Sequence, residues 1–267
     1  MILLRTLKRM LAMISFFTML LPGSIAFSEN DIIDSGTLYP NGTWTLMGDG
    51  AFRLEGKGST YYSNRADVPW YKSMDRIISA EIGPEVEQLG NYVFCDAENM
   101  CQLTLPEGLE WIGLRAFSDC KSLTSIELPA SVKSIDYWAF AGCSALREIV
   151  AGGNLDEISN YTFQDCEGLL RAVFLEPVRR LGYDSLENCY ALRELYLPSS
   201  IQIIDSYALN NCYSLTDIYY AGSREQWLQV TVADHNFSAL SRATVHYDCP
   251  YSPDNVTPLS SLTVWPE

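Results

Sequence analysis

The stretch FSDCKSLTSIELPASVKSIDYWAF, from Phe117 to Phe140, is one unit of a pattern that returns every 23 residues. Cysteines mark this period at Cys120, Cys143, Cys166, Cys189 and Cys212. Matching apolar positions continue without an insertion from about Ile77 to Tyr220. Self-similarity at a fixed period of roughly 20–50 residues indicates units that cannot bury their apolar faces alone and must stack.

The spacing inside the unit predicts its local structure. Ile126 and Leu128 are separated by Glu127, and this alternation predicts a short strand with the two apolar side chains inward. Pro129 ends the strand because it has no N–H to donate. Residues 135–140 are expected to form a short helical or 3₁₀ turn on the far side. The predicted fold class is therefore an α/β repeat solenoid of about six to seven rungs, with parallel strands.

Two units, FSDCKSLTSIELPASVKSIDYWAF and LENCYALRELYLPSSIQIIDSYAL, resemble the BspA-like leucine-rich repeat family, with 23-residue rungs forming a slab. The flanking segments GTWTLMGDGAFRLEGKG and DIYYAGSREQWLQV are similar to sequences that border such repeats. The resemblance implies a secreted or surface-displayed bacterial protein that acts in adhesion and protein binding. Two rungs depart from the pattern, because Gly152-Gly153 replaces the expected proline and Pro177 is shifted by two positions.

The N-terminus is typical of an export signal. A basic start is followed by an apolar run from Met10 to Leu21, about 12 residues long and so shorter than the roughly 20 that a bilayer requires. Residues 1–26 are therefore predicted to be a secretory signal peptide, with a retained membrane anchor as the alternative. The protein is expected to be secreted and extracellular, and an association with the cell surface is left open.

The remaining chain divides into four segments. Residues 27–70 are predicted to be an N-terminal β cap, because Trp44–Leu46 and Phe52–Leu54 alternate around a glycine-rich turn as in a β-hairpin. Residues 71–220 are the leucine-rich repeat solenoid, and residues 221–248 are a C-terminal cap. Residues 249–267, rich in proline and serine, are predicted to be a flexible tail.

Composition excludes several classes of partner. Removal of residues 1–26 takes away three of 18 basic residues and none of 33 acidic ones, which changes the net charge from −15 to −18. Such a surface repels phosphate backbones and anionic membranes. We expect no nucleic acid, no membrane association after signal cleavage, and a monomer.

Catalytic and metal-binding motifs are absent from the sequence. The chain has two histidines, His235 and His246, both outside the repeats, and no Gly-x-Ser-x-Gly, glycine-rich phosphate loop or Cys-x-x-Cys. Nucleophilic catalysis needs a nucleophile, a base and an orienting group, and zinc sites need closely spaced cysteines or histidines. The sequence predicts no catalytic residue, no metal site and no cofactor, and thus no enzyme.

The outward strand positions form columns on the predicted concave face. In the C-terminal half, one column changes from polar to apolar and aromatic residues, and the column beside it carries charged residues. The candidate binding residues are Glu148, Val150, Arg171, Val173, Glu194, Tyr196, Asp217 and Tyr219. Exposed apolar patches rimmed by polar groups are interaction sites, and tyrosine and arginine are enriched in binding hot spots. The alternative is that these tyrosines are only good strand formers.

The predicted function is non-catalytic protein–protein interaction and adhesion through this face, with a host, matrix or microbial protein as ligand. The alternative function is carbohydrate binding, with exposed tyrosines stacked on sugar rings. The five periodic cysteines are predicted to have a structural role. Neighbouring rungs lie roughly 4.8 Å apart, whereas the Cβ atoms of a disulfide lie about 3.8 Å apart, so disulfides between rungs are not expected. Buried, reduced thiols are expected, with Cys249 accessible. A second column, Tyr92, Trp138, Tyr161 and Tyr207, is expected to pack between turns.

Overall fold

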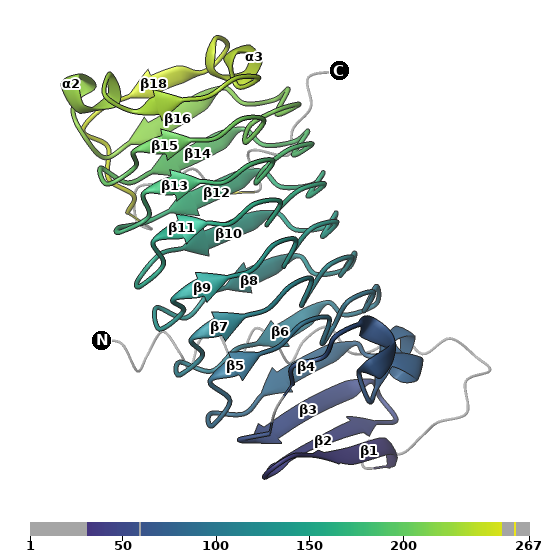
Figure 1. The fold of residues 1–267 in the computed structure, drawn as a ribbon. Helices are drawn as coiled ribbons and strands as arrows, with labels where there is room; N and C mark the ends of the chain where they lie inside the picture. The colour runs from purple at the N-terminus through teal and green to yellow at the C-terminus, as the bar shows by residue number, and fades with distance from the viewer. Residues whose placement is uncertain (1–30, 59, 253–258, 260–267) are drawn as a thin grey trace.

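A computed structural model describes residues 31–58, 60–252 and 259. The chain is a solenoid of about seven turns, and its strands stack one above another from the N-terminal cap to the C-terminal cap (Figure 1). The predicted signal peptide, residues 1–26, lies outside the described residues, as does most of the predicted tail.

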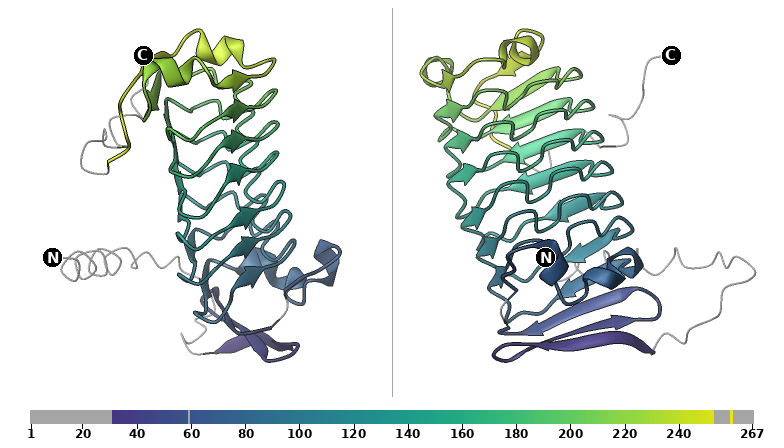
Figure 2. Two further views of the ribbon diagram at one scale, coloured as in Figure 1. Left: turned by 60° about the vertical axis from the view of Figure 1, so that its left-hand side comes forward. Right: turned by 45° about the vertical axis from the view of Figure 1, so that its right-hand side comes forward.

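From residue 125 onward, the longer strands of the rungs form a parallel six-stranded sheet on one face (Figure 2). Its strands, in spatial order, are β8 (Ser125–Glu127), β10 (Glu148–Ala151), β12 (Arg171–Phe174), β14 (Glu194–Leu197), β16 (Asp217–Tyr220) and β18 (Thr244–His246). Pairing follows the sequence period, because Ile149 lies beside Ile126 and Ala172. The repeat alone therefore sets the register, and β18 of the cap extends the sheet by one strand.

Two-residue strands form the second row of each rung. One group comprises β5 (Gln88–Leu89), β7 (Trp111–Ile112) and β9 (Ser134–Ile135). The other comprises β11 (Glu157–Ile158), β13 (Arg180–Leu181), β15 (Ile203–Ile204) and β17 (Thr231–Val232). All pair in parallel with their neighbours in the adjacent rungs.

The prediction of a helical or 3₁₀ turn in each rung is wrong, because the chain forms separate tight turns there. Ile135 belongs to β9, and the chain then makes successive tight turns in which Ala139 N–H donates to the carbonyl of Asp136 and Ala141 N–H to that of Trp138. These bonds have 3₁₀ spacing, but Trp138 has φ of 57°. A left-handed residue cannot continue a right-handed helix, so the turns remain separate.

The core of the solenoid is a column of identical side chains. The rings of Phe94, Phe117, Phe140 and Phe163 stack with centroids 5.5, 5.2 and 5.6 Å apart. All five periodic cysteines are fully buried, and each donates its S–H to a carbonyl 26 residues earlier, as Cys120 does to Phe94 at 3.3 Å. The predicted burial is confirmed. Each thiol fills space and satisfies a backbone acceptor of the preceding rung.

The N-terminal cap contains the predicted hairpin. Strands β2 (Gly42–Met47) and β3 (Ala51–Gly56) pair antiparallel. Strand β3 also pairs in parallel with β4 (Ser79–Ile82), which in turn pairs in parallel with β6 (Gln102–Thr104). A further strand, β1 (Ile32–Leu38), pairs with β2. It was not predicted because its sequence, IIDSGTL, does not alternate between apolar and polar residues.

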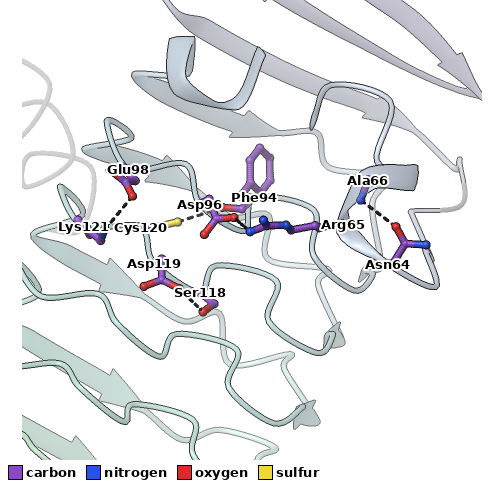
Figure 3. A network of polar contacts seen from close by, with 10 residues as sticks. All are labelled: Asn64, Arg65, Ala66, Phe94, Asp96, Glu98, Ser118, Asp119, Cys120 and Lys121. Atoms are coloured by element: carbon purple, nitrogen blue, oxygen red, sulfur yellow. Dashed lines mark hydrogen bonds and ion pairs between the residues drawn. The ribbon is translucent and has the colours of Figure 1, made fainter. Parts of the chain in front are cut away.

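Two short 3₁₀ helices, η1 (Arg65–Asp67) and η2 (Tyr71–Arg76), connect this cap to the solenoid. The Arg65 guanidinium forms an ion pair with Asp96, and Lys121 bridges to Glu98 on the preceding rung at 2.7 Å (Figure 3). Ion pairs thus link the cap to the first rungs through Arg65 and Asp96, and link successive rungs through Lys121 and Glu98.

The C-terminal cap ends the core with two short helices, α2 (Arg224–Trp227) and α3 (Phe237–Leu240). Asn236 is fully buried and fully bonded, since its amide donates to the carbonyl of Asp205 at 2.7 Å and accepts from Leu209 N–H at 2.9 Å. Trp227, predicted to close the solenoid, packs against the core. Within the described part of the chain, no helix has the length and apolar character needed to cross a membrane.

Candidate functional site

The strand register brings the eight predicted site residues together on the outward side of the six-stranded sheet, here called the outer face. Glu148, Arg171, Glu194 and Asp217 form one row across β10, β12, β14 and β16. Val150, Val173, Tyr196 and Tyr219 form the adjacent row on the same strands. Their grouping follows from the 23-residue period alone.

Their exposure differs from the expectation. Arg171 is 2% exposed, Val173 0%, Glu194 4% and Tyr196 7%, so the prediction that these four side chains face solvent is wrong. The other four, Glu148, Val150, Asp217 and Tyr219, are half-buried. The outer face of the C-terminal half is therefore largely covered.

A buried ion network lies under this cover. Arg171 Nη1 is 2.9 Å from Glu148 Oε1, and Arg171 Nε is 2.7 Å from Glu194 Oε2. Burial alone would lower the pKa of the Arg171 guanidinium, but hydrogen bonds and charge from Glu194 and Glu148 reverse the effect and raise it. Arg171 and Glu194 thus tie three strands together, and their charges are already paired.

An aromatic stack runs beside the ion network. The rings of Tyr196 and Tyr219 are 4.5 Å apart and nearly parallel, and Tyr219 stacks on His246 at 4.7 Å. His246 Nε2 is 2.8 Å from Asp217 Oδ1. Burial, with a smaller effect of Glu194, raises the pKa of Tyr196 well above its usual value. His246 belongs to this face, although the sequence assigned it no role beyond the cap.

Residues Cys249–Ser252, here called the strap, cover part of the outer face. The Cys249 N–H donates to the carbonyl of Tyr220 at 3.0 Å. The Tyr251 ring then packs edge-on against Tyr196, with centroids 5.3 Å apart at 82°. The prediction that a flexible tail begins at residue 249 is therefore wrong for the strap. Cys249 is half-buried rather than open, and its S–H donates to the carbonyl of Tyr247.

A cavity of about 310 Å³ lies between the strap and the ends of the strands. Its principal lining residues are Phe174, Tyr196, Leu197, Pro198, Pro250 and Tyr251. A concave, mainly apolar site with a few polar neighbours is typical of binding sites. The sequence could not predict this cavity, because it forms only where the strap meets the sheet.

The corresponding positions in the N-terminal half are open. Thr104, on β6 of the neighbouring sheet, and Glu127, on β8, stand at the repeat position of Tyr196. Gln102 and Ser125, on the same two strands, stand at the repeat position of Arg171, and all four side chains are exposed. The outer face thus changes from polar and solvated to apolar and covered along the solenoid.

One exposed aromatic pair was missed by sequence reasoning. Tyr190 and Tyr213 stack on the turn side with centroids 5.9 Å apart, and the Arg242 guanidinium lies over Tyr213. The two tyrosines are 23 residues apart, so the period contained the signal. The column that was predicted to pack between turns does so at Trp138 and Tyr161, whose rings stack at 4.3 Å. Among the residues that the structure describes, no group of three or more metal-binding side chains occurs.

Comparison with known proteins agrees with this architecture. Residues 87–216 match the BspA type leucine rich repeat region in six copies, so these residues form a leucine-rich repeat region of that type. No curated protein matches the chain.

Among solved structures, a leucine-rich repeat protein from Bacteroides ovatus ATCC 8483 is 22% identical with a TM-score of 0.56; the match covers 81% of this chain and 57% of that one. The chain thus spans little more than half the length of that protein. The leucine-rich repeat protein of T. pallidum is 21% identical with a TM-score of 0.51, over 64% of this chain and 86% of its own. At these identities the likeness establishes the fold.

Proposed function

We propose that this chain is a secreted or surface-associated, non-catalytic leucine-rich repeat protein that binds another protein through the C-terminal half of its outer face. The cavity of about 310 Å³ beside Tyr196 and Tyr251 carries the proposal. Half-buried Tyr219 stacks on Tyr196 of the cavity wall, and His246 stacks on Tyr219 and contacts Asp217. Tyrosine-rich centres with polar rims are typical of interface hot spots.

The repeat fold supports the proposal, because stacked repeats create extended surfaces that such proteins use for binding. The apolar lining of the cavity suits an aromatic or proline side chain of an extended segment, since the strap itself presents Pro250 and Tyr251 there. The partner is a host, matrix or microbial protein, and the role is adhesion. The protein acts as a monomer.

The test begins with the chain lacking residues 1–26, used as bait against extracellular proteins, followed by affinity measurement with the purified partner. Tyr219→Ala is expected to weaken binding by about tenfold or more, the size of a hot-spot contact. Tyr213→Ala is the matched control, because this tyrosine is 59% exposed and lies on the turn side. Equal affinity of wild type and Tyr219→Ala would remove the outer face from the proposal.

Export is tested separately. The full chain is expressed in a secreting bacterium and the N-terminus of the exported protein is sequenced. We expect it to begin at residue 27, because Ser24-Ile25-Ala26 provides small residues at a cleavage site. A product that retains residues 1–26 would contradict secretion by signal cleavage.

A further inference from the structure

A second cavity, of about 340 Å³, lies where the N-terminal cap meets the first rungs. Its volume falls within the range of small-molecule sites, which often form between structural units. Separate segments of the chain supply its principal lining residues, which are Pro40, Lys57, Tyr61, Glu85, Glu87 and Trp111. Trp111 belongs to β7 in the short-strand row, so this cavity is distinct from the outer face.

Buried hydrogen bonds hold the cavity in shape. Gly90 N–H donates to Thr60 Oγ1 at 2.9 Å, and Thr60 Oγ1 donates to the carbonyl of Gln88 at 3.2 Å. A Cβ at Gly90 would lie 2.1 Å from the Thr60 carbonyl oxygen, so only glycine permits this close approach. The walls at Thr60 and Gln88 are thus positioned before a ligand arrives, which lowers the entropic cost of binding.

An aromatic pair lines the cavity. The rings of Tyr61 and Trp111 are nearly parallel, with an interplanar angle of 20° and centroids 6.4 Å apart. Tyr61 is 64% exposed, and Trp111 is half-buried. The electron-rich faces of such rings attract positively polarised C–H groups, which a pyranose ring presents on its flat side.

The polar groups around the pair can both donate and accept. Lys57 Nζ lies 3.8 Å from Glu87 Oε1, and both side chains are more than half exposed. Such a surface pair is weak, so both groups can exchange this contact for bonds to a ligand. Carboxylates form short, strong bonds with hydroxyl donors. The carboxylates of Glu85 and Glu87 outnumber the single ammonium group and disfavour an anionic ligand.

We propose that this cavity binds an uncharged sugar unit of an oligosaccharide, with its ring against Tyr61 and Trp111 and its hydroxyls bonded to Glu87 and Lys57. The proposal stands apart from protein binding by the outer face and uses none of its residues. It rests on a preformed cavity, on an aromatic pair of one exposed and one half-buried ring, and on side chains that can donate and accept hydrogen bonds.

The test applies labelled protein, residues 27–267, to an array of neutral and acidic glycans and then titrates the strongest neutral oligosaccharide by calorimetry. Tyr61→Ala is the main variant, because its exposed side chain can be removed without unfolding the chain. We expect at least a tenfold loss of affinity for Tyr61→Ala and a similar loss for Trp111→Ala. Tyr213, at 59% exposure, is a comparable tyrosine far along the chain from the N-terminal cap, and Tyr213→Ala is expected to bind as wild type does.

Glu87→Gln distinguishes hydrogen bonding from stacking alone: it should weaken binding about three- to tenfold while leaving the aromatic pair intact. Three outcomes would overturn the proposal. These are no glycan bound at all, binding only of acidic glycans, and neutral binding that Tyr61→Ala leaves unchanged. Capture of a peptide ligand that Tyr61→Ala abolishes, without any glycan binding, would assign the cavity to peptides instead.

Discussion

Glu127 and Tyr196 occupy the same position of the repeat, three periods apart, yet their surroundings differ. Glu127 points into solvent on β8, whereas Tyr196 on β14 is 7% exposed and packs against Tyr219 and Tyr251. In the adjacent row, exposed Ser125 corresponds to buried Arg171. The repeat therefore decides where a side chain points, while segments outside the repeat decide whether it meets water.

The comparison has a functional consequence. The open half offers polar side chains that already contact water, so contacts with a partner would add little binding free energy. The covered half holds the aromatic and apolar groups that can contribute binding free energy. The strap limits access to these groups. Four experiments, ordered from the largest expected effect to the smallest, test how far the two halves differ.

The largest effect is expected from Arg171→Ala. The substitution leaves Glu194 and Glu148 without their partner, and Glu194 is buried. Loss of one partner of a buried ion pair costs about 3–5 kcal/mol. Urea unfolding should show this loss, whereas Gln102→Ala at the corresponding open position should change stability by less than about 0.5 kcal/mol. Similar values for the two variants would contradict the contrast between the halves.

Tyr196→Ala should have the next largest effect. It removes a ring that stacks on Tyr219 and contacts Tyr251, and we expect a loss of about 2–3 kcal/mol, below that for a fully enclosed core aromatic. The control is Glu127→Ala, which should be nearly neutral. If Tyr196→Ala is also neutral in urea unfolding, the covered half is not packed as described.

Tyr251→Ala should separate cover from stability. The ring lies at the edge of the fold and is half-buried, so we expect less than about 1 kcal/mol of destabilisation. Nitration of Tyr196 by tetranitromethane, followed by peptide mass mapping, should become several-fold faster. Nitration of Tyr213 serves as the internal control and should not change. An unchanged rate at Tyr196 would show that the strap does not limit access.

Alkaline titration should give the smallest effect. Burial raises the pKa of Tyr196 in the folded state, so the stability contributed by neutral Tyr196 is complete below pH 10 and declines as pH rises above it. Absorbance at 295 nm should show a late-titrating tyrosine in the wild type that is missing in Tyr196→Phe. In Tyr251→Ala it should titrate earlier, because part of the burial is lost. An unchanged profile would contradict the role of the strap.

Much of the fold could be predicted because the repeat encodes it redundantly. Ile126 and Leu128 indicate one strand, and their equivalents in other rungs confirm its register. The helical turn was mispredicted because Trp138 adopts a left-handed conformation that side-chain pattern alone does not reveal. Strand β1 was missed because it completes a sheet edge with a pattern too irregular to recognise.

The candidate site was only half predictable, for a similar reason. Period and alternation placed Tyr196 and Tyr219 side by side on one face, as observed. The contact of Tyr251 with Tyr196 joins residues 55 positions apart in a segment with no repeat. The Tyr61–Trp111 pair is likewise formed by a cap residue and a rung residue. Neither contact leaves a periodic signal.

The sequence by itself determined the solenoid, its 23-residue rungs, its buried cysteine column and the direction of each strand side chain, because stacking of identical units allows one register. Only the tertiary structure decided which outward residues are covered, which charges are paired and where cavities form. These properties depend on how the non-repeating caps and strap pack against the rungs, and that packing is set by contacts between distant segments.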